Sequence, residues 1–241
     1  VLPFENLSDA KGNEYFVSGM QDMILTSLYK LRDLKVISRT STEKYASRPE
    51  NLRQVAAELG VAYILEGSVQ RDGDHVLINL QLIDARSDTH VWADAFERDV
   101  QSVFTVEKEV AGVVADALRT TLLPAAQAGL GAAPTRNAAA YDLFLRAEYE
   151  YHRYNVANSL PDSLFQAIEH YEQAVAADPD FALAYARLAS ARALKYWDGR
   201  LGDDTREGLA AKVLAAAKRA KELSPDLPEA DLAMGDYQYR V

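Results

Sequence analysis

The chain has 241 residues, of which 49% are hydrophobic and 26% charged, and its formal net charge is −10. This balance is that of a globular protein and excludes general disorder. The absence of cysteine excludes disulfides, thiol nucleophiles and thiolate metal sites. Residues 1–122 carry 13 basic and 19 acidic side chains, and the remainder is acidic as well. This argues against nucleic acid or an anionic membrane as the main partner. No apolar run approaches the ~20 residues that a membrane-spanning helix needs.

The first half of the chain mixes strand and helix periodicities. Val1–Phe4 is expected to be a short strand. Because the sequence starts within this strand and without an initiator Met, we expect the chain to be part of a longer protein. Apolar residues then recur at three- and four-residue steps from Asn13 to Leu31, which predicts an amphipathic helix. Residues 34–39 are expected to form a second strand, and residues 52–59 a short helix ending at Gly60.

Three strands and a helix complete this half. Residues 61–71 and 76–82 are expected to be strands joined through Asp72-Gly73, because glycine accepts the positive φ that a tight hairpin turn requires. Strict apolar alternation from Val76 to Leu82 predicts one buried and one solvent-facing side. A third strand is expected around Trp92, and a closing helix from residue 103 to 118. The predicted order, β-α-β-α-β-β-β-α, indicates an α+β domain in which helices cover one face of a mixed sheet.

The composition changes abruptly after residue 122. Eleven alanines precede that point and 28 follow it. Residues 123–137 contain two prolines and two glycines without apolar periodicity, which is typical of a linker. We therefore expect one domain at residues 1–122, a linker at 123–137 and a second domain at 138–241.

The second half is expected to be entirely helical, and its sequence repeats. Asp178-Pro179-Asp180 recurs 46 residues later as Ser224-Pro225-Asp226, and the residues around the two prolines match at the same offsets. Each proline ends one helix and turns the chain into the next. A small residue follows a large one at Leu188-Ala189 and at Met234-Gly235, which lets antiparallel helices approach closely.

This pattern resembles the tetratricopeptide repeat. Ala167, Tyr171, Ala174 and Pro179 match the second helix of that repeat. The resemblance implies an all-α solenoid over residues 138–241, with two enlarged units and the first helix of a third. The units are enlarged because their 46-residue spacing exceeds the ~34 residues usual for this repeat.

A series of short motifs runs from Val1 to Phe104 in the first half. They are Val1-Leu-Pro-Phe4, Asn6-Leu-Ser8, Glu14-Tyr-Phe16 with Gly19, Val36-Ile-Ser-Arg-Thr-Ser41, Leu59-Gly60, Glu66-Gly-Ser-Val69, Leu82-Ile-Asp84, Trp92 and Phe104. In this order and spacing they resemble the TolB amino-terminal-type domain of bacteria. Such a domain typically precedes tetratricopeptide repeats in chains that begin with an adenylate cyclase or a winged-helix DNA-binding domain, commonly with a membrane span between. The resemblance implies a periplasmic or cytoplasmic part of such a protein.

The sequence offers little that indicates catalysis, a cofactor or a metal, and we expect none of these. Its four histidines are scattered, and no two have the i, i+4 spacing of a helical zinc site. Glu66-Gly67-Ser68 lacks the flanking residues of a serine nucleophile elbow, and Gly67 is better explained by a bulge or a close packing point. The segment 36–41 could hold an anion with Arg39 and its hydroxyls, or it is a strand end followed by a turn.

The helical repeats are the better candidate for a functional surface. In a stacked repeat array the first helix of each unit lines the concave side, which suits a peptide or a partner helix. The expected partner-binding residues are Asp142, Arg146, Tyr149, Ala186, Ser190, Ala193, Leu232, Asp236 and Tyr239. The third repeat lacks its second helix, and we expect its first helix either to meet a second copy of the chain and form a homodimer or to be poorly ordered.

The leading interpretation is therefore a non-enzymatic sensory or scaffolding region, within a bacterial adenylate cyclase or winged-helix transcriptional regulator. It is expected to bind a protein or peptide, and no nucleic acid. One alternative is a component of an envelope-assembly or secretion complex. A second alternative is a hydrolase that uses Ser38, Ser41 or Ser68.

Overall fold

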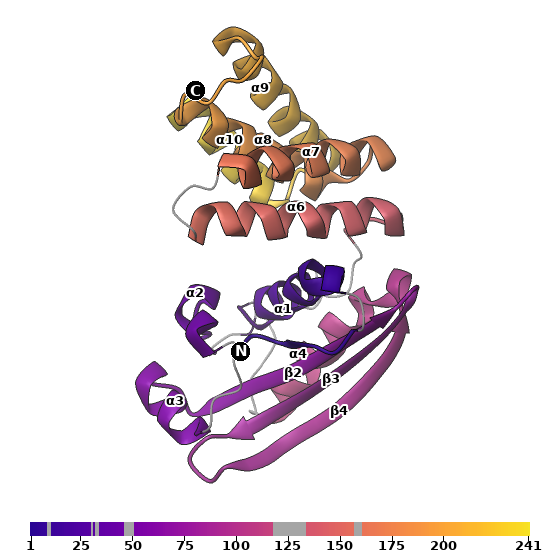
Figure 1. Cartoon of the computed structure of the whole chain (residues 1–241), viewed down its shortest axis with the longest axis vertical. Helices are drawn as coiled ribbons and strands as arrows, with labels where there is room; N and C mark the ends of the chain where they lie inside the picture. Colours follow the sequence, from indigo (N-terminus) through magenta and orange to yellow (C-terminus); the bar gives the residue numbers. More distant parts are fainter. Residues whose placement is uncertain (9–10, 30, 32–33, 46–50, 118–133, 157–160) are drawn as a thin grey trace. The chain divides into compact units, whose positions relative to one another are not determined.

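The computed structural model describes residues 1–241 except residues 9–10, 30, 32–33, 46–50, 118–133 and 157–160. The chain divides into two compact units, Val1–Ala133 and Pro134–Val241, shown in Figure 1. The first contains a four-stranded sheet with helices, and the described residues of the second form helices and turns. An α+β part followed by a helical part is thus confirmed.

The sheet of the first unit has the strand order β1-β2-β3-β4, formed by Glu5–Asn6, Tyr63–Asp72, His75–Asp84 and Thr89–Asp99. Strand β1 pairs with β2 in parallel, and the other neighbours are antiparallel. The predicted hairpin joins β2 to β3, with Asp72 opposite His75 and Gly73 at φ 57°. The sheet is therefore mixed, as predicted.

The helices of this unit lie on both faces of the sheet. They are η1 (Lys11–Asn13), α1 (Glu14–Tyr29), α2 (Arg39–Thr42), η2 (Glu43–Tyr45), α3 (Leu52–Leu59), η3 (Val100–Ser102) and α4 (Phe104–Ala117). Arg71 of β2 contacts Phe16 and Tyr15 of α1, and Arg98 of β4 contacts Glu109 of α4, so α1 and α4 cover the same face. That face carries the alternating apolar residues of β3, all of which are buried as predicted.

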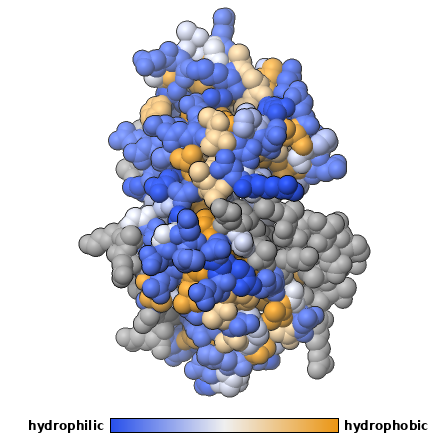
Figure 2. All heavy atoms as spheres, turned by 90° about the vertical axis from the view of Figure 1, so that its right-hand side faces the viewer, coloured by the Kyte–Doolittle hydropathy of each residue, from blue (hydrophilic) through white to orange (hydrophobic). Residues whose placement is uncertain are grey.

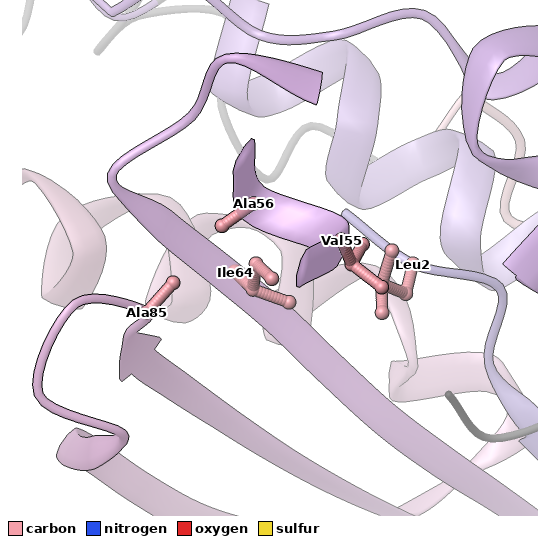
Figure 3. Close-up of a cluster of buried hydrophobic side chains, with 5 residues drawn as sticks. All are labelled: Leu2, Val55, Ala56, Ile64 and Ala85. Atoms are coloured by element: carbon pink, nitrogen blue, oxygen red, sulfur yellow. The ribbon is translucent and has the colours of Figure 1, made fainter. Parts of the chain in front are cut away.

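Helix α3 covers one end of the opposite face, which the sequence did not predict. Its Val55 and Ala56 pack with Leu2 and Ile64 and with Ala85, the residue after β3 (Figure 3). The helix begins at Asn51, whose side chain accepts from Gln54 N–H, and ends at Gly60 with φ 66°. Its bounds match the predicted helix because both end signals are local in sequence.

Two predicted strands are wrong in place or in kind. The first lies at Glu5–Asn6 rather than at Val1–Phe4, where Leu2 N–H donates to Leu65 O at 2.9 Å and Pro3 has no N–H to continue the ladder. Residues 34–38 form no strand, and Arg39 already begins α2. Both sides of β2 are occupied by β1 and β3. β propensity alone does not create a strand without a neighbour to pair with.

The second unit contains helices α6 (Ala138–Val156), α7 (Pro161–Ala177), α8 (Ala182–Trp197), α9 (Arg206–Leu223) and α10 (Pro228–Arg240). Helix α6 packs on α7, α8 packs on α9, and α10 packs on both α8 and α9. The residues that matched the repeat are in the core: Ala167, Tyr171 and Ala174 on α7 are fully buried. The helical half of the predicted fold is thus confirmed.

This unit begins at Pro134, ahead of the predicted start at residue 138. Asn137 Oδ1 accepts from the N–H groups of Ala139 and Ala140 at the start of α6, and its Nδ2 donates to Ala177 O at 2.8 Å. Thr135 Oγ1 donates to Asp178. The end of the predicted linker is therefore attached to the end of α7. The rest of that linker, residues 123–133, lies outside the described residues.

Candidate interaction surface

The predicted partner-binding residues lie on three helices of the second unit, α6, α8 and α10. On α6, Asp142 and Tyr149 are half-buried and Arg146 is exposed. Arg146 Nε donates to Asp142 Oδ2 at 2.9 Å, one helical turn away. The guanidinium of Arg153 lies 5.8 Å from the centre of the Tyr149 ring. These side chains form a polar strip that a partner can reach.

On α8 the prediction is wrong for two of its three residues. Ala186 and Ala193 are buried, at 1% and 0% exposed, whereas Ser190 is half-buried. Helices α7, α9 and α10 all pack against α8, and a methyl group is too small to reach past them. These two alanines therefore serve close helix packing rather than partner binding.

On α10, two of the three positions 46 residues further along are exposed. Leu232 and Tyr239 are 64% and 74% exposed, and Asp236 is half-buried against Arg240 at 3.0 Å. The Tyr239 ring stacks on Trp197 of α8, with centroids 5.6 Å apart and an interplanar angle of 17°. These rings form an exposed aromatic pair at the ends of α8 and α10. The homodimer expected through this helix stays a prediction.

Three further residues, which the sequence analysis did not select as binding residues, join α6, α7 and α8. Tyr171 is fully buried on α7, and its hydroxyl donates to Glu148 on α6. Arg187 on α8 lies beside the same carboxylate, with Nε 3.4 Å from Glu148 Oε1. Its buried Nε makes no hydrogen bond within the described part of the chain, and 37% of its side chain is exposed. We call Glu148, Tyr171 and Arg187 the Arg187 cluster.

The charges around the cluster keep Arg187 ionised and both nearby tyrosines neutral. The negative charge of Glu148 raises the pKa of Arg187. Burial, and then the Glu148 charge, hold the pKa of Tyr171 well above its ordinary value. The pKa of Tyr151 is also raised, by burial first and then by Asp236 of α10. At neutral pH the cluster thus presents one partly exposed cation, which can bind a carboxylate or a backbone carbonyl.

The sequence indicated only one member of this cluster, Tyr171. Tyr171 stands at a repeat position, which predicts its burial but not the partner of its hydroxyl. Glu148 and Arg187 are 39 residues apart and lie on different helices, so no local spacing connects them. Basic residues on an alanine-rich helix are a signal of this kind, but α8 carries Arg187, Arg192 and Lys195, so the signal alone does not select Arg187.

In the first unit the suggested anion site is occupied by protein groups. Arg39 Nη1 donates to Asp22, its Nη2 donates to Ser18 Oγ at 2.7 Å, and Nε lies 3.9 Å from Glu43. The Ser38 and Ser41 hydroxyls lie 3.1 Å from each other. The segment is therefore the start of a short helix held to α1, and Arg39 is already paired with carboxylates.

The remaining chemical candidates are also engaged in structure. Ser68 Oγ accepts from Asn79 Nδ2 at 3.4 Å across β2 and β3. His75 Nδ1 lies 3.1 Å from Asp99, and both side chains are mostly exposed. Among the described residues, no three histidine, aspartate or glutamate side chains gather as they would around a metal ion. None of the helices in the described ranges combines the length and hydropathy that a membrane span requires.

The surface has no single dominant apolar region on the face shown in Figure 2. Hydrophilic residues cover most of its described part, and hydrophobic residues appear between them as small patches. The exposed large apolar side chains of the helical unit include Phe165, Trp197, Leu232 and Tyr239. A partner would thus meet a mostly polar surface with a few aromatic contacts, as is common in non-obligate interfaces.

Comparison with known proteins relates both units to regulatory proteins. Residues 1–112 match the family model described as "HilA/YgeH-like transcriptional regulator, second domain". Over 212 residues the chain is 32% identical to a protein of Rhizobium meliloti (strain 1021) named "Putative adenylate cyclase 3", a match that covers 87% of this chain and 35% of that protein. The chain thus spans about a third of the length of this relative. It is similar to regions of bacterial signalling and regulatory proteins.

Proposed function

We propose that this chain is a non-enzymatic sensory or scaffolding region of a larger bacterial signalling protein, of the adenylate cyclase or winged-helix regulator type. The first unit would be a TolB amino-terminal-like domain, and the second a short array of enlarged tetratricopeptide repeats. A protein or peptide partner would bind the helical unit along α6 and α8. The chain itself would have no catalytic role.

The Arg187 cluster is the observation that carries this proposal. It places a partly exposed, permanently charged guanidinium where α6, α7 and α8 meet. Burying a charged residue among alanines costs stability unless it is paired. Here the Glu148 carboxylate lies 3.4 Å from Arg187 Nε, and the charge of Glu229 also acts on this guanidinium. The exposed part of the Arg187 side chain is open to an acceptor from a partner, which favours a role in recognition.

The similarity of both units to parts of regulatory proteins supports the same proposal. The match to the putative cyclase runs through 87% of the chain, and so includes residues of both units. The protein named "Putative adenylate cyclase 3" is therefore similar to this chain over residues of both the α/β unit and the helical unit. We infer that the pair works together, with the helical unit as the receiver of the partner.

The test uses the full-length protein in its own cells, with cyclic AMP and transcript levels as readouts. Arg187→Met removes the charge but keeps the length of the side chain, and Arg219→Met is the matched control on α9, where Arg219 pairs with Asp180 on the surface. We expect Arg187→Met to change the output while the control does not, with equal thermal stability of the two variants. An unchanged output in a protein that lacks residues 134–241 would contradict the proposal.

A further inference from the structure

Strand β4 forms one edge of the sheet, so half of its backbone N–H and C=O groups point away from the other strands. Within the described part of the chain, β4 pairs with β3 on one side and with no strand on the other. It is 11 residues long, and such an edge is a template for pairing with another chain. The opposite edge is short, since β1 has two residues and follows Pro3.

The hydrogen-bond pattern shows which residues of β4 point to the free edge. A two-residue hairpin makes Asp72 and His75 a hydrogen-bonded pair, so the even residues of β3 bond to β4. The bond from Val100 N–H to Asp74 O at 2.8 Å agrees with this pattern. Even residues of β4 thus face β3, and the N–H and C=O groups of Ala93, Ala95 and Glu97 point to the free edge.

Two charged side chains of β4 itself bond to these edge groups. Asp94 Oδ1 accepts from Ala95 N–H at 2.8 Å. Arg98 Nη1 donates to Glu97 O, also at 2.8 Å. One edge donor and one edge acceptor, two residues apart, are therefore already used where a second strand would have to pair.

Arg98 is held in this position from α4. Its Nη2 donates to both carboxylate oxygens of Glu109, at 3.0 and 2.8 Å, and its guanidinium lies 5.8 Å from the centre of the buried Phe96 ring. Asp94 stands opposite Leu80 in the register, on the face that α1 and α4 cover elsewhere. A charge at such an inward-facing edge position opposes the burial that a second sheet would require.

We propose that Asp94 and Arg98 close the β4 edge to strand addition, and that removing both turns this edge into an antiparallel contact between two copies of the chain. The occupant is a second copy because the same edge on both molecules is self-complementary in a two-fold pairing. In the unaltered protein this edge is closed, so partners bind elsewhere.

The direct test compares the full chain with the double variant Asp94→Thr/Arg98→Thr by light scattering coupled to size exclusion. We expect the molar mass of the variant to double at concentrations where that of the unaltered chain does not change. The control is Glu97→Thr/Arg53→Thr, which removes one acidic and one basic exposed side chain. It keeps the hydrogen bonds of Asp94 and Arg98 to the edge groups. A double variant that associates no more than this control overturns the proposal.

Amide exchange locates the contact and covers the case in which the double variant fails to fold. In the unaltered chain we expect the Ala95 amide to exchange several-fold more slowly than the Ala93 amide, which also points to the edge. In the associated variant the amides of Ala93, Ala95 and Glu97 should gain protection. Equal exchange of Ala93 and Ala95 in the unaltered chain, or association without protection of β4, would overturn the proposal.

Discussion

Gly67 and Leu80 face each other across β2 and β3 so closely that no side chain fits between them. A Cβ built on Gly67 would lie 2.5 Å from Leu80 Cδ2 and 2.9 Å from the carbonyl oxygen of Asn79. The pair is in regular register, and no bulge interrupts β2 and β3 there. Of the two interpretations of Gly67 from the sequence, the close packing point is therefore the right one.

Gly67→Ala should therefore destabilise the first unit by about 1–3 kcal/mol, since overpacking a core displaces its neighbours. The measurement is the free energy of unfolding in urea. Gly112→Ala is the control, because a Cβ on this helical glycine of α4 meets nothing within 4 Å. That variant should be stabilising by about 0.5–1 kcal/mol. A neutral Gly67→Ala would show that Leu80 moves aside freely.

Leu80→Asp should unfold the first unit. The side chain is 2% exposed in the centre of β3, and an unpaired carboxylate there costs several kcal/mol, which is comparable to the stability of a small domain. Asn79→Asp introduces the same group on the opposite face of the strand, where the residue is half-buried. We expect the thermal transition of the first unit to be lost in Leu80→Asp and kept in Asn79→Asp. Equal melting of both variants would contradict the assignment of Leu80 to the buried face of β3.

The helical unit should lose stability in acid through Asp204. Its carboxylate accepts from Lys195 and Lys212, each at 2.6 Å, and these hydrogen bonds lower its pKa from 3.8 to about 2. A lowered pKa stabilises the fold above pH 3.8, and this contribution is lost as the pH falls towards 2. Thermal melting between pH 5 and 2 measures the loss.

Asp204→Asn removes this part of the pH dependence. It also leaves the ammonium of Lys195, whose side chain is 11% exposed, without its carboxylate. We expect a loss of about 1–3 kcal/mol at pH 7, the range for a buried group that loses its partner. Asp203→Asn, at the exposed neighbour, should leave both the stability and its pH profile unchanged. Parallel pH profiles for Asp204→Asn and the unaltered chain would contradict the assignment.

Limited proteolysis should cut the chain first between residues 123 and 134. The prediction comes from the alanine, glycine and proline composition of this stretch, since small-residue linkers are preferred sites. Cuts should not reach Thr135 or Asn137, because both are hydrogen bonded to the end of α7. Mass spectrometry of the first fragments gives the cut positions. Initial cleavage outside residues 123–134 would contradict two separately stable units.

The sequence predicted those elements whose signals are local. Alternation identified the buried face of β3, glycine identified the hairpin and the end of α3, and the repeated proline turns identified the helices of the second unit. The predicted strand at 34–39 failed because β propensity alone does not make a strand: residues 34–38 pair with no described strand, and Arg39 begins α2. Composition and periodicity carry no information about which edges remain open.

The candidate site was predicted less well than the fold, for a related reason. Helix periodicity gives the face of α8 that carries Ala186 and Ala193, but a neighbouring helix covers that face. The Arg187 cluster depends on which side chains of α6, α7 and α8 meet, and their separation in sequence hides this. Contacts between these helices thus have to come from the structure.

The central claim, that the helical unit binds a protein partner along α6 and α8, is tested most directly by photocrosslinking. A photoreactive phenylalanine analogue replaces Tyr149 on α6 in the full-length protein in its own cells. Phe165 on α7, which is 38% exposed, receives the same analogue as the control. We predict a crosslinked species at position 149 that Arg187→Met abolishes, and none at position 165. Equal crosslinking at both positions, or a position-149 product that persists in Arg187→Met, would contradict the claim.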